Sequence, residues 1–337
     1  MNVTPLTPKP VVRRSAFGKL FFSVLVLLLA GSIFLFRQQI IDQINFRNYV
    51  PNAAVTTITQ RAELTDEGTF YFYASHPAIQ ERTLFNQSCT NLKSETTIVL
   101  GCYGAQRIYL FNVTDAKLDG IREVTAAHEM LHAAYDRLPR WQRDSIDKLL
   151  ETEASKITDP DFTELMKAYE RSEPGERSNE LHSIIGTQVA SISPQLEKYY
   201  GRYFKNRSTL IGLYTKYQAV FANIKDQQDQ LVKDMDDMIA QINSATDTYN
   251  TGVARLNIDI QAFNQRADSG GFTSQGQFNS ERSVLLLRQR QLADDRTLID
   301  GYIVTYNTKK QQLATINSQA EALNRSINSN LTPLPNL

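Results

Sequence analysis

The sequence predicts a mainly α-helical fold with a small antiparallel β-sheet, preceded by one apolar helix and followed by a long helical hairpin. Three observations favour this class: one uncharged apolar run near the N-terminus, a group of short β-prone runs in the first half, and a proline-free stretch from 195 to 332 with apolar residues at three-four spacing. The 36 basic and 36 acidic residues cancel, which leaves no cationic surplus for capturing nucleic acid. We therefore expect no nucleic-acid partner.

The apolar run covers residues 20–36 and lies between Lys19 and Arg37. Its 17 uncharged residues approach the roughly 20 that a bilayer-spanning helix requires. Bulky residues follow the small cluster at 30–32, which favours an uncleaved signal anchor over a cleaved signal peptide. We predict a single transmembrane helix over residues 20–36.

Residues 1–19 form a tail whose charged side chains are all basic, namely Lys9, Arg13, Arg14 and Lys19. Such a bias keeps the N-terminus in the cytoplasm, so the chain after Phe36 is expected on the other side of the cell membrane. The first segment there, residues 37–64, is expected to be a linker or stalk.

The two cysteines, Cys89 and Cys102, flank an apolar run. An oxidising compartment outside the cytoplasm would let them pair, and closing a loop of this length stabilises a domain by about 3 kcal/mol. Two free buried thiols are the alternative. We expect the disulfide.

Three β-prone runs are expected to form the sheet. They are residues 69–74 (TFYFYA), 96–103 (TTIVLGCY) and 107–113 (RIYLFNV). Because only residues 104–106 separate the last two runs, we expect an antiparallel pair there.

A helix is expected from Ile121 to Arg137, and it carries the sequence His128-Glu129-Met130-Leu131-His132. Two imidazoles four residues apart project from one helix face and can bind one Zn²⁺, while the intervening Glu129 can act on a water at the metal. The alternative is that both histidines only fill a helix face. It is disfavoured because the helix already has an apolar stripe, formed by Val124, Ala127, Leu131 and Ala134.

A catalytic zinc site needs a third protein ligand. The metzincin pattern is excluded, because Tyr135 and Leu138 occupy the positions of its glycine and third histidine. A later segment, helical by pattern, reads N-E-x-x-S-x-x-G from Asn179 to Gly186 and offers a carboxylate.

The two helix motifs together are similar to those of the gluzincin metallopeptidases, the thermolysin-like group, over about residues 65–205. The resemblance implies a zincin-like α+β domain, one Zn²⁺ per chain and hydrolysis of peptide bonds. It implies that His128, His132 and Glu180 are zinc ligands and that Glu129 is the general base. A small residue late in the second motif would permit close helix packing.

His182 is the alternative third ligand. It lies about 200° around the helix from Glu180, so the two side chains cannot easily bind one ion. The sequence lacks an identifiable substrate-binding histidine further on, which leaves the oxyanion stabiliser open. The candidates are phenols that can equally be core residues, namely Tyr199, Tyr200 and Tyr203.

Residues 206–329 are predicted to form an antiparallel coiled-coil hairpin of two long helices. Apolar residues recur at three-four spacing from Leu210 to Phe263 and again from Leu292 to Ile327. A glycine-rich break places the turn at about 269–277, and residues 330–337 remain as a tail. Pairing within one chain and pairing between two chains both stay open.

We expect a membrane-anchored, extracytoplasmic zinc-dependent peptidase. Its substrate would be a peptide or protein that pairs with residues 107–113 as an edge strand, and residues 20–36 would bind the membrane. The alternative is a cell-envelope scaffold that self-associates or binds an envelope partner through its coiled coil, with a structural or relic metal site. Hydrolysis of another amide, such as one in a cell wall, is a third hypothesis, but fold analogy favours a peptide.

Overall fold

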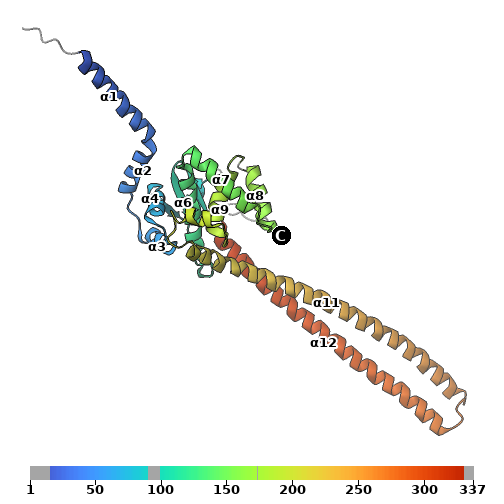
Figure 1. The fold of residues 1–337 in the computed structure, drawn as a ribbon. Helices are drawn as coiled ribbons and strands as arrows, with labels where there is room; N and C mark the ends of the chain where they lie inside the picture. The colour runs from blue at the N-terminus through green and yellow to red at the C-terminus, as the bar shows by residue number, and fades with distance from the viewer. Residues whose placement is uncertain (1–15, 90–98, 173, 330–337) are drawn as a thin grey trace, which may run out of the picture. The chain divides into compact units, whose positions relative to one another are not determined.

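The computed structural model describes residues 16–89, 99–172 and 174–329, and this part of the chain is largely helical with one three-stranded sheet (Figure 1). The predicted mainly α class with a small sheet is therefore confirmed. The chain divides into two compact units. The first unit comprises residues up to Asn112, Gly120–Tyr214 and the residues from Ser329, and the second comprises Val113–Asp119 and Thr215–Asn328.

The chain begins with helix α1 (Ala16–Leu35), followed by helix α2 (Arg37–Asn48). Within the described residues, no single helix is long and apolar enough to cross a membrane, but Phe21–Leu35 and Arg37–Asn48 reach that length and composition together, with a bend of 62° between them. Most of the predicted span thus lies in α1. Residues 1–15 of the expected cytoplasmic tail, and the tail at 330–337, lie outside the described residues.

The expected linker over residues 37–64 is wrong, because this segment is folded into the first unit. Helix α3 (Ala53–Arg61) is capped by Asn52, whose side chain accepts a hydrogen bond from the Val55 amide at 2.9 Å. Val55 and Ile58 are buried on α3. Two apolar residues three positions apart are a weak signal for a helix in the sequence. The helix is stabilised because Val55 and Ile58 are buried in the first unit.

Helix α2 is joined to the unit by a buried ion pair. Asp42 accepts two hydrogen bonds from the Arg137 guanidinium, one from Nε at 2.9 Å and one from Nη2 at 2.7 Å. Both side chains are at most 5% exposed. Arg137 also donates to the Tyr103 hydroxyl at 3.1 Å and to the Ala133 carbonyl at 2.8 Å, so this network ties α2 to the helix that carries the two histidines.

We expect Asp42→Ala to lower the free energy of unfolding by about 3–5 kcal/mol, because the substitution leaves a buried guanidinium without its counter-charge. Urea unfolding of the purified protein measures this loss. The double variant Asp42→Leu/Arg137→Met removes both charges and should lose less than the single variant. A single variant within about 1 kcal/mol of wild type would show that the ion pair does not hold α2.

The predicted strand over residues 69–74 is wrong, since this run lies in helix α4 (Asp66–Ala74). Thr65 begins the helix, and its hydroxyl accepts a hydrogen bond from the Gly68 amide at 3.1 Å. The aromatic residues favour a strand locally, but in the helix they pack against other aromatic rings. Phe70 lies 5.2 Å from Phe46 of α2, and Tyr71 lies 6.2 Å from Tyr203, between ring centroids. Capping and tertiary packing therefore override β propensity.

The sheet has the strand order β1-β3-β2, with β1 at Ala78–Gln80, β2 at Gly101–Gly104 and β3 at Arg107–Phe111. Strand β3 pairs in parallel with β1 and antiparallel with β2, so the expected purely antiparallel sheet is mixed. It also follows that β3 is central, and the expectation that residues 107–113 form an edge strand is wrong. Residues 96–98 of the second predicted run lie outside the described residues.

A disulfide joins Cys89, the last residue of helix α5 (Arg82–Cys89), to Cys102 in β2, with 6.1 Å between the Cα atoms. Both cysteines are buried. The bond links α5, which lies between β1 and β2 in the chain, to the edge strand β2, and the expected pairing of the two cysteines is present.

The first unit also contains α6 (Ile121–Asp136), which is buried along most of its length, and four further helices. Helix α9 (Arg177–Gln188) packs against α6. A Cβ atom on Gly186 would lie 2.5 Å from Cδ1 of Leu131 and 2.7 Å from Cε1 of Tyr200, so a residue without a side chain permits this close approach. The other three helices are α7 (Arg140–Ala154), α8 (Pro160–Ser172) and α10 (Pro194–Tyr200).

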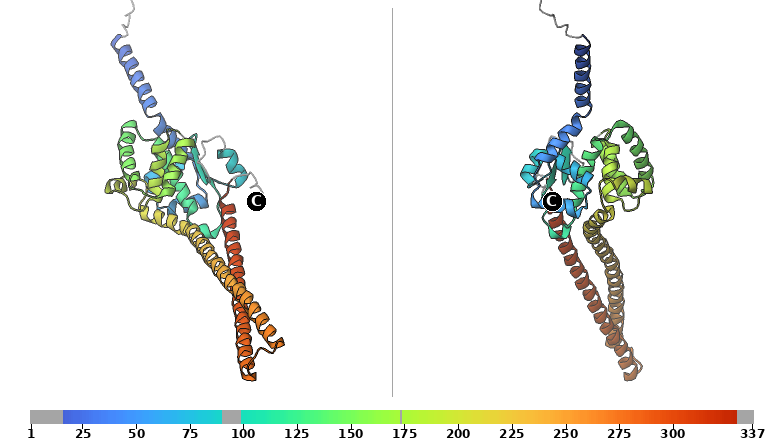
Figure 2. Two further views of the ribbon diagram at one scale, coloured as in Figure 1. Left: turned by 90° about the vertical axis from the view of Figure 1, so that its right-hand side faces the viewer. Right: turned by 60° about the vertical axis from the view of Figure 1, so that its left-hand side comes forward.

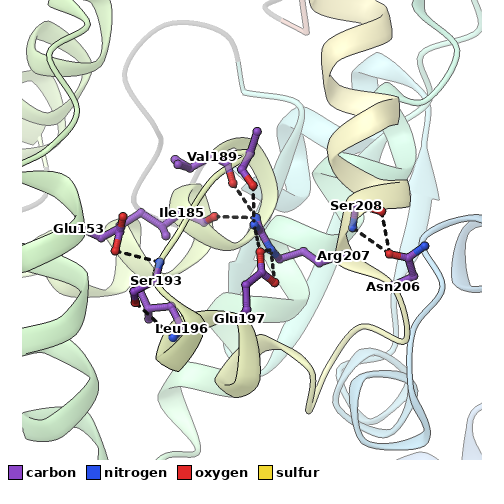
Figure 3. A network of polar contacts seen from close by, with 10 residues as sticks. Glu153, Ile185, Val189, Ser193, Leu196, Glu197, Asn206, Arg207 and Ser208 are labelled. Atoms are coloured by element: carbon purple, nitrogen blue, oxygen red, sulfur yellow. Dashed lines mark hydrogen bonds and ion pairs between the residues drawn. The ribbon is translucent and has the colours of Figure 1, made fainter.

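Arg207 closes the C-terminal end of α9 (Figure 3). Its guanidinium donates to the carbonyls of Ile185 at 3.3 Å, Val189 at 2.7 Å and Ala190 at 3.0 Å, and its Nε lies 3.1 Å from both carboxylate oxygens of Glu197. The last carbonyls of a helix have no partner within the helix, and a cation there also interacts favourably with the helix dipole. The first unit consequently extends to Tyr214 rather than ending at the predicted residue 205.

We expect Arg207→Met to lower the free energy of unfolding by about 2–3 kcal/mol, because it leaves carbonyl groups at the end of α9 without donors. Chemical unfolding measures this loss. Glu197→Gln is the control and should cost less than about 1 kcal/mol, since the Glu197 side chain is 45% exposed and stays solvated. Equal losses in the two variants would assign the effect to the ion pair instead of to the carbonyls.

The second unit contains α12 (Gln275–Ile327) and all of α11 (Arg207–Asp268) from Thr215 onwards, and these two long helices lie side by side in Figures 1 and 2. Polar side chains join them in pairs that run in opposite directions: Gln228 with Asn317, Asp234 with Lys309, Asp259 with Arg288, and Arg266 with Glu281. The helices are therefore antiparallel within one chain. The turn covers residues 269–274, slightly shorter than predicted, and Gly270 has a positive φ of 67°.

The predicted apolar seam is the less exposed side of both helices. The apolar residues of the seam are buried or half-buried, although the helices are otherwise mostly exposed. On α11 these are Leu231, Met235, Met238, Ile242, Val253, Leu256 and Phe263; on α12 they are Leu292, Tyr302, Tyr306, Leu313, Ile316 and Leu323.

Candidate metal centre

Helix α6 presents the two histidines. Gly120 precedes its first residue and has a φ of 103°, a left-handed conformation that favours glycine. His128 and His132 are 7% and 5% exposed. Since they are four residues apart, they project from the same face of the helix.

Glu180 on α9 completes a cluster of three potential metal ligands. One ligand atom from each of His128, His132 and Glu180 lies within 4.8 Å of the others. The two Nε2 atoms are 3.0 Å apart, and Glu180 places one carboxylate oxygen 3.6 Å from Nε2 of His132 and the other 3.8 Å from Nε2 of His128. The structure thus brings together the three side chains that the two motifs predict as ligands.

This donor set fits a zinc ion. Two imidazole nitrogens and a carboxylate are the ligands of a catalytic zinc site with one position left open. Bonds of about 2.0–2.1 Å in tetrahedral geometry place ligand atoms about 3.3 Å apart, and the observed separations lie on both sides of this value. The site is buried, which excludes most competing water. Imidazole nitrogens suit transition metals such as Zn²⁺, whereas Ca²⁺ and Mg²⁺ prefer oxygen ligands. Two imidazoles and one carboxylate therefore favour a transition metal over Ca²⁺ or Mg²⁺.

Asn179 orients one of the ligands. Its Oδ1 lies 3.0 Å from Nδ1 of His132 and accepts a hydrogen bond when that nitrogen carries the proton. This tautomer leaves the Nε2 lone pair directed at the cluster, which is the arrangement that metal-binding histidines require. Asn179 precedes Glu180 in the sequence, so one turn of α9 supplies both the ligand and the support of a second ligand.

Glu129 is 1% exposed and lies against the first residue of strand β2. A Cβ atom on Gly101 would be 2.6 Å from Oε1 of Glu129, 2.8 Å from its Cγ and 2.7 Å from Cγ2 of Thr125. Gly101 therefore leaves the space that the Glu129 carboxylate occupies. Glu129 follows His128 on α6, about 100° further around the helix.

His182, the alternative third ligand, is outside the cluster. Its ring is fully buried among aromatic residues, and its Nε2 lies 2.9 Å from the Tyr199 hydroxyl. Burial, and then the neighbouring His132, lower the pKa of His182 to about 3, against the opposing effect of the Leu131 backbone. The ring is neutral at ordinary pH and serves as a packed, hydrogen-bonded part of the core.

The three candidate tyrosines surround His182. The Tyr200 hydroxyl donates to the His182 carbonyl at 2.7 Å, and the Tyr199 and Tyr203 hydroxyls are 3.2 Å apart. Burial raises the pKa of all three phenols, to about 12 for Tyr203, so they remain protonated donors. The Tyr200 hydroxyl donates its proton within the core and is not available to an oxyanion. The hydrogen-bonded pair of Tyr199 and Tyr203 remains the candidate for the oxyanion stabiliser.

Three residues of this region were not predicted from the sequence in the roles that the structure gives them. Asn179 was expected as part of a motif but not as the partner of His132. Gly101 carried a signal, because a glycine inside a β-prone run is typical of close approach by another group. No signal in the sequence indicated the Arg207 network, because its partners are backbone carbonyls distant in sequence.

In comparisons with models of protein families, with curated protein sequences and with solved structures, none matches this chain. The metal centre must therefore be interpreted from its own chemistry.

Proposed function

We propose that this chain is a membrane-anchored zinc-dependent peptidase of gluzincin type whose metal site is formed by His128, His132 and Glu180. The observation that carries the proposal is the buried cluster of two imidazoles and one carboxylate, together with a buried Glu129 that lies between the two histidines in the sequence. A site that only stabilised the fold would not require an acidic residue between the two histidines. The apolar helix α1, which holds residues 20–35 of the predicted span, supports the anchor, with the N-terminus proposed to be cytoplasmic.

The residues divide the chemistry among them. A bound zinc ion would lower the pKa of a coordinated water and polarise the substrate carbonyl. The Glu129 carboxylate takes the proton of the attacking water and delivers it to the leaving amine, as a general base and then a general acid. Asn179 holds His132 in the ligating tautomer, and Gly101 leaves the space that the Glu129 carboxylate occupies.

Strand β2 is the edge that best suits an extended substrate. It has β3 on one side and no other described strand on the other side. Its first residue lies against Glu129, so a peptide added along β2 would pass the general base. The proposed peptide-binding edge is therefore Gly101–Gly104 and not the central strand β3.

The proposal is tested by offering the purified, full-length protein a mixed peptide library. We expect cleavage that is lost when a chelator removes zinc and returns when zinc is added. Protein that carries zinc and is folded but leaves every peptide intact would refute the peptidase function.

Gly101→Ala should reduce peptide hydrolysis by about 10²-fold while leaving zinc content unchanged. The added methyl group would overlap the Glu129 carboxylate, and a misplacement of about 1 Å at a catalytic group costs that much. Rates and zinc content of the same sample measure both effects. Gly212→Ala is the control, because nothing lies within 4 Å of a Cβ atom there. Wild-type activity in Gly101→Ala would contradict the assigned position of Glu129.

A scaffold function is the second candidate, and the long hairpin favours it. Helices of 62 and 53 residues, with a shared apolar seam, are typical of an antiparallel coiled coil that spaces or joins partners. Removal of residues 215–328 distinguishes the two functions, since this cut spares Arg207. If the chain is a peptidase, the shortened protein still cleaves the library. If it is a scaffold with a relic metal site, neither the full-length nor the shortened protein cleaves it.

A further inference from the structure

Helix α2 has two different faces. One face contacts the first unit through residues at three-four spacing. Gln38 accepts from Gln106 at 2.9 Å, Asp42 pairs with Arg137, the Asn45 carbonyl lies 3.0 Å from Nε2 of His76, and the Tyr49 hydroxyl just after the helix donates to the Pro77 carbonyl at 2.7 Å. These contacts fix the rotation of α2 about its own axis.

The opposite face is exposed and apolar, with a basic residue at each end. Ile40, Ile41 and Ile44 are 43%, 42% and 52% exposed, and Arg37 and Arg47 are also exposed. At 100° per residue, these five side chains share an arc of about 120° that points away from the contacting residues. Isoleucines between two arginines can enter the acyl-chain boundary of a membrane while the long arginine side chains reach the headgroups.

We propose that this face of α2 lies on the lipid bilayer surface, with the three isoleucines in the boundary between headgroups and acyl chains and both arginines at lipid phosphates. The inference rests on the proposed span of α1, because α2 follows α1 after a single residue, Phe36, and so begins at the membrane. The bend of 62° turns α2 away from the direction of α1 and towards the membrane plane.

Charge and size favour lipid over a protein partner. The face carries two cations and no acidic residue, since the one carboxylate of α2, Asp42, is on the other face and paired with Arg137. Arginine binds phosphate groups well because of its planar set of donors. A stable protein interface requires roughly 20–30 residues from each partner, many more than the five on this face.

The placement has a consequence for the metal centre. Asp42 holds Arg137, which follows the last turn of the helix that bears His132. A helix α2 that rests on the bilayer therefore keeps the metal centre at a fixed distance from the membrane surface.

The test uses the full-length chain in vesicles of phosphatidylcholine and phosphatidylglycerol. Both native cysteines form a disulfide, so a single introduced cysteine can carry an environment-sensitive fluorophore. We choose Ile41→Cys on the exposed face, Gln39→Cys on the flank of the same helix as the matched control, and Leu28→Cys within α1. Quenchers attached to lipids at known depths, and a water-soluble quencher, locate each fluorophore.

We expect the fluorophore at residue 41 to be quenched from lipid, at a depth of about 5–10 Å, and to be protected from the aqueous quencher, while the one at residue 39 shows the reverse. Lipid quenching at residue 28 but aqueous quenching at residue 41 would overturn the inference and leave the anchor intact. Protection of residue 41 from both quenchers would also overturn it, because a protein would then cover the face. Aqueous quenching at residue 28 would refute the anchor itself.

Discussion

Replacement of Glu129 by glutamine is expected to reduce peptide hydrolysis by about 10²–10⁴-fold, the usual contribution of a general base. Glutamine has nearly the same shape but cannot take a proton from water at neutral pH. The neighbouring ligands are unchanged, so the variant should bind as much zinc as the wild type. Cleavage rates and metal content, measured on the same preparations, test both statements.

The result separates catalysis from metal binding. Zinc-loaded, folded Glu129→Gln that cleaves at the wild-type rate would remove Glu129 from the mechanism. Loss of zinc in this variant would instead mean that the buried Glu129 carboxylate contributes to the metal site, which the proposal does not include. Unfolding curves exclude a general loss of structure.

The second large effect is expected at α9. Glu180→Ala should weaken zinc binding by more than about 100-fold, because it removes one of three ligands. Asn179→Ala removes only the hydrogen bond that orients His132 and should weaken binding by about 10–100-fold, the usual cost of losing such support. Competition with a chelator of known affinity measures both constants.

A matched control for this pair is Glu164→Ala, since Glu164 is an exposed carboxylate on α8 and should not affect zinc. An affinity in Glu180→Ala equal to that of the wild type would contradict the assigned third ligand and return His182 to consideration. An Asn179→Ala effect as large as that of Glu180→Ala would indicate that Asn179 does more than orient His132.

The predicted ligands come from local patterns, which explains why the sequence places them together. Two histidines at i and i+4 share a face of any helix, and a motif of eight residues on α9 fixes Glu180 relative to Gly186, where the two helices approach closely. Each pattern is contained within two turns of helix. The two motifs, through the family resemblance that they carry, predict the members of the cluster with His182 as the alternative third ligand, and the helix contact brings the three side chains within reach.

Other features depend on partners distant in sequence. Residues 69–74 are β-prone by composition, but the Thr65 cap and the rings of Phe46 and Tyr203 make them a helix. Helix α2 carries few apolar residues on its contacting face and is held instead by the pairing of Asp42 with Arg137, about 95 residues later. Strand β1 has only three residues, too few to predict, and its presence makes β3 central.

The most direct test of the metal centre is zinc K-edge X-ray absorption of the purified, full-length protein, with zinc content measured on the same sample. The account predicts one zinc per chain, bound by two imidazoles and by oxygen ligands at about 2.0–2.2 Å, and no bound zinc in His128→Ala/His132→Ala. Folded wild-type protein that takes up no zinc when zinc is supplied, or zinc retained by the double variant, would contradict the assignment of His128, His132 and Glu180 as the metal site.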